Sequence, residues 1–282
     1  MVNPHFRGPK LQMKEAVESR RWNSAICAFL LSLVCVLALG RSVRPQAGRA
    51  PMGTADPPSP AKAASALPPA IVIGFVGGVI RHDDLVHSEV QLAARLRKEY
   101  PSGVDVETYE NYRWENARKK ILSLLDTNHS GTLTPDEKHN ARIILYGHSW
   151  GGSAAITLAR ELGKDGIPVL LTIQVDSVAK FSQNDSLVPA NVAQAANYYQ
   201  PDGLIHGQTA IRAADPSRTK IVGNFRFDYK GVAYACGAYP WYDRMFMKPH
   251  TQIECDPKVW DQVEALIRSA LSQSQAPAGQ SK

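Results

Sequence analysis

The stretch ARIILYGHSWGGSAAITLARELG, residues 141–163, constrains the fold more than any other part of this sequence. It begins with a largely apolar run, residues 141–147, which has the length and composition of a buried strand. It continues with apolar residues at helical spacing over residues 151–163, where the first turn is made of small residues. Such a strand–turn–helix unit belongs to an α/β architecture if further strands and helices alternate around it.

That alternation extends along the rest of the chain. Short β-rich runs predict strands at residues 70–78, 104–110, 141–147, 167–178 and 220–229. Helical periodicity predicts helices at residues 87–100, 114–125, 151–163 and 256–271. Strands that alternate with helices predict a mostly parallel sheet flanked by helices, which is an α/β fold.

Asp256 and Pro257 are predicted to be the N-cap and the first residue of the last helix.

The aromatic and amide-rich stretch at residues 191–203 allows two interpretations. It could line the mouth of a pocket, or it could form a helix that packs Tyr198 and Tyr199 into the core, and we favour the helix.

The N-terminal 40 residues have the order of an export signal. Positively charged residues precede a 17-residue stretch without charge, residues 24–40, that ends in the small residues Ala38 and Gly40. We expect a signal peptide, or alternatively an uncleaved membrane anchor formed by residues 24–40. The chain is therefore expected to be exported, periplasmic or secreted, or else membrane-anchored. Residues 41–70 are rich in Pro and Ala and predict a linker, so that residues 71–282 form the folded domain.

The formal net charge of +6 comes from the N-terminal tail. Residues 1–70 contain 9 Lys and Arg against 3 Asp and Glu, whereas residues 71–282 contain 23 of each. The predicted domain therefore has no overall basic field that would attract phosphate backbones, and the sequence contains no nucleic-acid-binding motif. We expect no nucleic-acid partner.

Cys236 and Cys255 are the only cysteines in the predicted domain. A single pair in an exported domain predicts a disulfide rather than two free thiols. This bridge would close a loop around residues 247–250. Metal binding by the pair is not expected, because the spacing fits no zinc pattern.

The pentapeptide GHSWG, residues 147–151, fits the pattern G-x-S-x-G between a strand and a helix. In such a turn the serine adopts a strained conformation, and its neighbours must be small to avoid clashes. Gly147, Gly151 and Gly152 meet that need. The alternative is an ordinary turn in which Ser149 caps the helix, and the context favours the first interpretation.

With this turn, the alternation of strands and helices and an earlier GFVGG at residues 74–78, the chain resembles the α/β-hydrolase superfamily in its lipase, esterase and thioesterase branch. The resemblance covers residues 71–271 and implies a minimal form that begins at the family's third strand and has no large lid domain. It implies that Ser149 is a nucleophile. It also implies an oxyanion hole formed by the backbone N–H of Trp150 and by that of Gly77 or Gly78.

The resemblance further implies the chain order Ser, then Asp or Glu, then His. His250 fits best as the base, because it lies in a predicted loop just before the final helix; a histidine on a surface loop is the alternative. Asp176 is favoured as the acid because it ends a buried strand, where an isolated carboxylate would be costly. Other candidates are weaker: the acids Asp228, which is the reserve, Asp202 and Asp243, and the histidines His139, His148 and His206.

The dodecapeptide DTNHSGTLTPDE, residues 126–137, matches an EF-hand calcium loop position by position. It offers oxygen atoms from Asp126, Asn128, Ser130, Thr132 (through its carbonyl), Thr134 (directly or through water) and Glu137. Gly131 lies at the sharp turn. Because Asn and Ser replace acids and only one such loop is found, we expect weak affinity, and a metal-free polar loop is the alternative.

The calcium loop precedes the amino end of the strand at residues 141–147, whereas Ser149 follows its carboxyl end. At ~3.3 Å per residue the strand separates the two by roughly 20 Å. Calcium is therefore expected to be a structural cofactor that does not touch a substrate.

The functional prediction is an exported serine hydrolase that cleaves a small-molecule or lipid acyl ester or thioester. It has calcium as a structural cofactor and no organic cofactor. An inactive, calcium-stabilised binding module and an acyltransferase are the alternatives. The N-terminal segment is expected to be the part that contacts a membrane, and no feature of the sequence indicates an oligomeric state.

Overall fold

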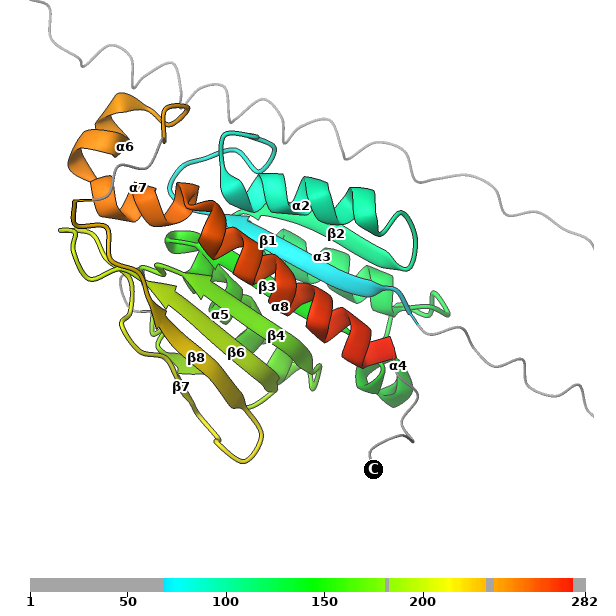
Figure 1. Ribbon diagram of the computed structural model, residues 1–282. Helices are drawn as coiled ribbons and strands as arrows, with labels where there is room; N and C mark the ends of the chain where they lie inside the picture. The colour runs from blue at the N-terminus through cyan, green and yellow to red at the C-terminus, as the bar shows by residue number, and fades with distance from the viewer. Residues whose placement is uncertain (1–67, 181–182, 232–235, 276–282) are drawn as a thin grey trace, which may run out of the picture. The chain divides into compact units, whose positions relative to one another are not determined.

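The computed structural model describes residues 68–180, 183–231 and 236–275. The predicted signal or anchor at residues 1–40, and the linker up to residue 67, lie outside the described residues. Within the described part of the chain no helix is long and apolar enough to cross a membrane. The elements follow one another in this order (Figure 1): β1 (Ala70–Val76), α2 (Ser88–Glu99), β2 (Val104–Glu110), α3 (Trp114–Leu125), α4 (Pro135–His139), β3 (Ile143–His148), α5 (Trp150–Lys164), β4 (Val169–Val175), β5 (Leu187–Val188), β6 (Val192–Tyr199), β7 (Arg212–Ala213), β8 (Lys220–Arg226), α6 (Trp241–Phe246), α7 (Lys248–Cys255) and α8 (Pro257–Gln275).

The main sheet has six strands in the order β2-β1-β3-β4-β6-β8. Every neighbouring pair in it is parallel. A separate short parallel pair joins β5 and β7. The parallel sheet confirms the predicted fold class. Because all six strands run the same way, their carboxyl ends meet at one edge, which is where ligands bind in open sheets of this kind.

Helices cover both faces of the sheet (Figure 1). α2 and α8 pack on one face in a cluster with Val72, Tyr146 and Ile173. α3 and α5 pack on the other face in a cluster with Ile71, Ile73 and others. Successive side chains of β1 thus enter opposite cores, and the strand is buried along its whole length. This explains why the central strands β1, β3 and β4 appear in the sequence as largely apolar runs rather than as alternating ones.

The prediction of a helix at residues 191–203 is wrong, because the segment forms strand β6. β6 pairs with β4 on one side and with β8 on the other, so both edges of its backbone are hydrogen-bonded. Its Ala, Gln and Asn residues have little intrinsic preference for a strand, and pairing with its two neighbours decides the outcome. Tyr198 is buried as expected, but it stacks on Phe225 within the sheet.

The segment before the last helix also differs from the prediction. His250 lies in helix α7 and not in a loop, and two short helices, α6 and α7, precede α8. α8 begins as predicted, since the backbone N–H of Lys258 donates to Asp256 Oδ1 at 2.9 Å. Both α6 and α7 lie near the carboxyl edge of the sheet, at the upper left in Figure 1.

Candidate active site

Ser149 occupies a strained turn between β3 and α5. Its φ of 55° and ψ of −127° lie in a region that residues other than glycine rarely adopt. The backbone segments around this turn approach one another so closely that two neighbouring positions have no room for a side chain. A Cβ added at Gly147 would lie 2.4 Å from the carbonyl carbon of Gly151, and one added at Gly151 would lie 2.1 Å from the carbonyl oxygen of Phe75. These two positions therefore accept only glycine, as the sequence indicated.

His250 and Asp176 are joined directly. Nδ1 of His250 is 2.7 Å from Oδ2 of Asp176, and both side chains are buried. Asp176 follows the carboxyl end of β4 with a positive φ of 42°. Its carboxylate also accepts hydrogen bonds from the side-chain amide of Gln200 at 2.8 Å and from the backbone N–H of Gly207 at 2.7 Å. These donors fix the position and orientation of the carboxylate.

Ser149 and His250 open into one cavity of about 560 Å³. Within the described residues no direct hydrogen bond joins the two side chains. In free enzymes the catalytic contacts are often longer than in complexes with substrate. Much of the cavity wall is apolar, and it includes Val79, Ile80, Trp150, Val178, Ile205 and Met247. The cavity therefore combines a serine, a histidine held by a carboxylate and an apolar surface.

The predicted oxyanion residues lie beside the serine. Gly77, Gly78 and Trp150 line the cavity. Gly77 packs on Ser149, since a Cβ added at Gly77 would lie 3.1 Å from Ser149 Cβ. Asn111 stabilises the loop after β1, because its side-chain amide donates to the carbonyls of Val76 at 3.1 Å and Gly78 at 2.6 Å.

Most of the weaker candidates lie apart from this group. Asp228 is exposed and pairs with Arg226 at 2.8 Å, and Asp202 pairs with Lys230 at 3.0 Å. His206 contacts the carbonyl of Gly207 at 3.2 Å. Asp243 does line the cavity, where burial raises the pKa of its carboxyl. Among the acids weighed from the sequence, Asp176 is thus the one that contacts His250.

A second group of buried polar side chains includes His148, the residue that precedes Ser149. The ring centroid of His148 lies 4.5 Å from that of His250 with the two rings tilted by 36°, and the group also contains His87, Glu89 and Glu254. Burial raises the pKa of Glu254 to about 8 and that of Glu89 well above its usual value, while burial lowers the pKa of His148. We call these four residues the rear cluster.

Cys236 and Cys255 form the predicted disulfide, with their Cα atoms 5.8 Å apart. Cys255 is the last residue of α7, the helix that carries His250. The bridge thus attaches the end of that helix to the segment before α6. It leaves no free thiol in the described part of the chain.

The predicted calcium loop connects α3 to α4, and it lies before the amino end of β3 (Figure 1). Asp126 accepts from the backbone N–H groups of Ser130 at 3.0 Å and Gly131 at 2.8 Å. Glu137 accepts from the backbone N–H groups of Thr127 and Thr134, both at 2.9 Å. These backbone and hydroxyl bonds, that of Thr134 foremost, lower the pKa of Glu137 to about 2.

The donor set of this loop fits a hard cation. The residues at its predicted ligand positions offer oxygen atoms, and Asp126 and Glu137 supply two negative charges at its two ends. Gly131 has a φ of 79°, as the sharp turn of such a loop requires. A bound calcium ion would take Glu137 from its contacts with Thr127.

Sequence reasoning missed several residues that shape the site. Asn111 and Gln200 come directly after the carboxyl ends of β2 and β6. Polar residues at that edge of a parallel sheet are the expected place for functional side chains, so this rule could have found them. His87, Glu89 and Glu254 had no such signal, since only the fold brings them together.

Strand order, the strained serine turn and helices on both faces define a minimal fold of the α/β-hydrolase type. The sequence matches no protein-family model and no curated protein.

Solved structures resemble it only distantly. A putative hydrolase of the alpha/beta superfamily from Xanthomonas campestris pv. campestris is 12% identical, with a TM-score of 0.34 over 71% of this chain and 99% of that one. Human thioesterase 2 is 10% identical, with a TM-score of 0.36 over 74% and 98%. Est1E from Butyrivibrio proteoclasticus is 10% identical, with a TM-score of 0.37 over 74% and 91%. At these values the likeness carries no argument about function, which has to come from the site.

Proposed function

We propose that this protein is an exported serine hydrolase that cleaves a carboxylic ester or thioester. One observation carries the proposal. A histidine held by a buried carboxylate, with 2.7 Å between Nδ1 and Oδ2, shares a cavity with a serine on a strained strand–helix turn. That combination is the arrangement of nucleophile, base and orienting acid used in acyl transfer.

In the proposed reaction Ser149 Oγ attacks the carbonyl carbon of the substrate, and its proton passes to Nε2 of His250. Asp176 keeps the other ring nitrogen protonated and stabilises the resulting imidazolium. His250 then gives the proton to the departing alcohol or thiol as the carbonyl–oxygen or carbonyl–sulfur bond breaks. Water, deprotonated by His250, then attacks the acyl-serine. The bond between the acyl carbon and Ser149 Oγ breaks, and His250 returns the proton to Oγ as the acid is released. The N–H groups of Trp150 and of Gly77 or Gly78 are the proposed donors to the oxyanion.

The cavity supports an acyl substrate with an apolar portion. Its wall beyond the serine is formed mainly by aliphatic and aromatic side chains, including Val79, Ile80 and Val178. Burying an alkyl chain against such a wall stabilises the complex by about 0.8 kcal/mol per methylene. The disulfide between Cys236 and Cys255 supports export, because such bonds persist outside reducing compartments.

Labelling with a fluorophosphonate tests the proposal, since the reagent reacts with activated serines. We expect the folded protein to gain one adduct that maps to the peptide containing Ser149, and heat-denatured protein to gain none. A folded protein that takes up no label would contradict the hydrolase proposal and leave the inactive binding module. Preferred transfer of the acyl group to an added alcohol, in place of hydrolysis, would instead identify an acyltransferase.

We propose that the loop at residues 126–137 binds one calcium ion as a structural cofactor. Calcium at ten times its Kd would stabilise the fold by about 1.4 kcal/mol, which raises Tm by roughly 3–6 °C. Glu137→Gln should remove this increase, whereas Asp136→Asn, a neighbouring acid outside the predicted ligand set, should keep it. Thermal unfolding with calcium and with a chelator measures the effect. An equal increase in the Glu137→Gln protein would contradict the site.

A further inference from the structure

The rear cluster is buried and incompletely satisfied. Glu89 is fully buried, and neither of its carboxylate oxygens has a hydrogen-bond partner. Neither ring nitrogen of His148 has a well-aligned partner, although this side chain is 3% exposed. Buried polar atoms in native proteins are almost always paired, so the two oxygens of Glu89 and the poorly aligned ring nitrogens of His148 together call for a further partner.

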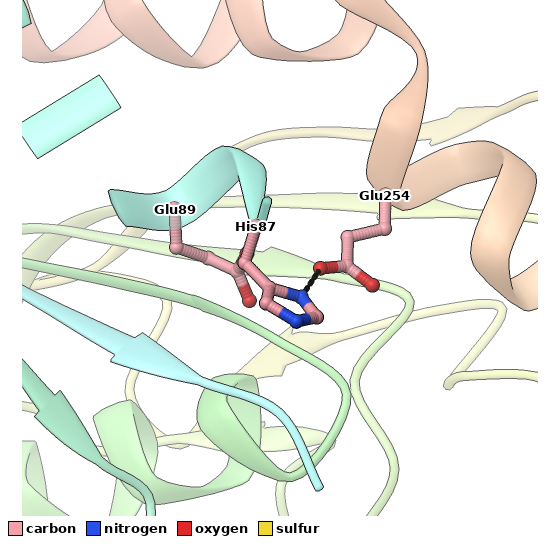
Figure 2. A group of neighbouring side chains, drawn as sticks. All are labelled: His87, Glu89 and Glu254. Atoms are coloured by element: carbon pink, nitrogen blue, oxygen red, sulfur yellow. Dashed lines mark hydrogen bonds and ion pairs between the residues drawn. The ribbon is translucent and has the colours of Figure 1, made fainter. Parts of the chain in front are cut away.

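The side chains converge on one point, although they come from separate segments. His87 and Glu89 come from the start of α2, and Glu254 comes from α7 (Figure 2). One ligand atom from each of these three residues lies within 4.8 Å of the other two. Nδ1 of His148 is 3.3 Å from Glu254 and 3.9 Å from Glu89.

We propose that this cluster binds one divalent transition-metal ion of the zinc class, with four ligands: His87, Glu89, His148 and Glu254. Two imidazoles with two carboxylates form a donor set that zinc accepts, whereas calcium and magnesium prefer oxygen atoms alone. Metal–ligand bonds of 2.0–2.1 Å separate the ligands of a tetrahedral ion by roughly 3.3 Å. The His148–Glu254 pair already has this spacing. His87 and Glu254, now 2.6 Å apart, would exchange their hydrogen bond for the ion.

Charge supports the same assignment. Glu89 and Glu254 are two buried carboxylates, and within the described residues no Lys or Arg pairs with either of them. A divalent cation would neutralise both at once. His87, His148 and Glu254 also line the cavity described above, which gives an ion a route from solvent. Glu89 lies deeper and would close the site from the rear.

The ion would join three parts of the proposed catalytic apparatus. His148 adjoins Ser149 in the sequence, His87 ends the loop that begins at Gly77, and Glu254 lies one helical turn after His250 in α7. Binding would therefore position the helix that carries His250 relative to the serine turn. The site itself depends only on the four ligands and not on the proposed hydrolase activity.

Zinc binding to the untagged full-length protein tests the proposal without reference to activity. We expect one equivalent of zinc to remain after dialysis, and millimolar calcium not to displace it. Cobalt in its place should give the intense visible absorption of a four-coordinate ion. Glu89→Gln should bind zinc at least tenfold more weakly, whereas Glu161→Gln, a partly exposed acid paired with Lys164, should bind as the wild type does.

If the Glu89→Gln protein does not fold, His87→Gln replaces it with the same expected loss, and the cobalt spectrum of the wild type needs neither variant. Folded wild-type protein that retains less than a tenth of an equivalent of zinc would overturn the proposal. In that case bound protons would neutralise the two buried carboxylates. Unchanged affinity in a folded variant of Glu89 or His87 would also overturn it. So would a weak, six-coordinate cobalt spectrum, because it would place the ion elsewhere.

Discussion

Replacing Asp176 with asparagine is expected to lower kcat/KM for an ester substrate by about 10⁴-fold while the protein stays folded. The carboxylate accepts a hydrogen bond from Nδ1 of His250 at 2.7 Å and thereby leaves Nε2 free to take the serine proton. An asparagine amide directed at Nδ1 would favour the opposite tautomer. Its oxygen can still accept from Gly207, which now donates to Asp176 at 2.7 Å, so the turn after β4 should persist.

Asp228→Asn is the matched control for this substitution. Asp228 was the reserve acid from the sequence, but it is exposed and pairs with Arg226. We expect its kcat/KM to stay within about twofold of the wild type, as is usual for surface changes. Steady-state kinetics and circular dichroism of both variants decide between the two acids. Activity that survives Asp176→Asn but is lost with Asp228→Asn would reverse the assignment.

Gly151→Ala is expected to destabilise the protein by about 3 kcal/mol, the upper part of the range for overpacking. The added methyl group would lie 2.1 Å from the carbonyl oxygen of Phe75, and neither backbone segment can move without disturbing β1 or the serine turn. The better helix propensity of alanine, about 1 kcal/mol, offsets part of a larger steric cost. Tm should fall by roughly 6–12 °C, as measured by thermal unfolding.

The same substitution at Gly237 controls for the loss of glycine itself. A Cβ added there meets no atom within 4 Å, so Gly237→Ala should change stability by less than about 0.5 kcal/mol. A Gly151→Ala protein as stable as the Gly237→Ala protein would show that the turn relaxes freely. In that case the strain at Ser149 would not depend on the close approach of these backbones.

The parts of the fold that could be predicted are those in which local pattern and global packing agree. β1, β3 and β4 are apolar because both faces of the sheet are covered, and α5 begins after glycines that the close packing requires. β6 was mistaken for a helix because its stability comes from pairing with β4 and β8, which no local pattern records.

The candidate site likewise contains residues that the sequence could predict and residues that it could not. Ser149 could be found because its turn demands small neighbours, and Asp176 because a buried strand ends at it. The rear cluster could not be found, since its members are separated by up to 167 residues along the chain, as between His87 and Glu254. Only the arrangement of α2, α7 and the serine turn brings them together.

The parallel sheet separates two parts of the protein that can vary independently. The proposed nucleophile, base and acid all lie at the carboxyl edge of the sheet. The connection between α3 and α4 lies at the amino edge. Insertions or deletions in that connection are therefore expected to leave the cavity and the residues that line it unchanged. For an engineer, we expect that the connection between α3 and α4 can be altered to adjust stability separately from the residues that line the cavity.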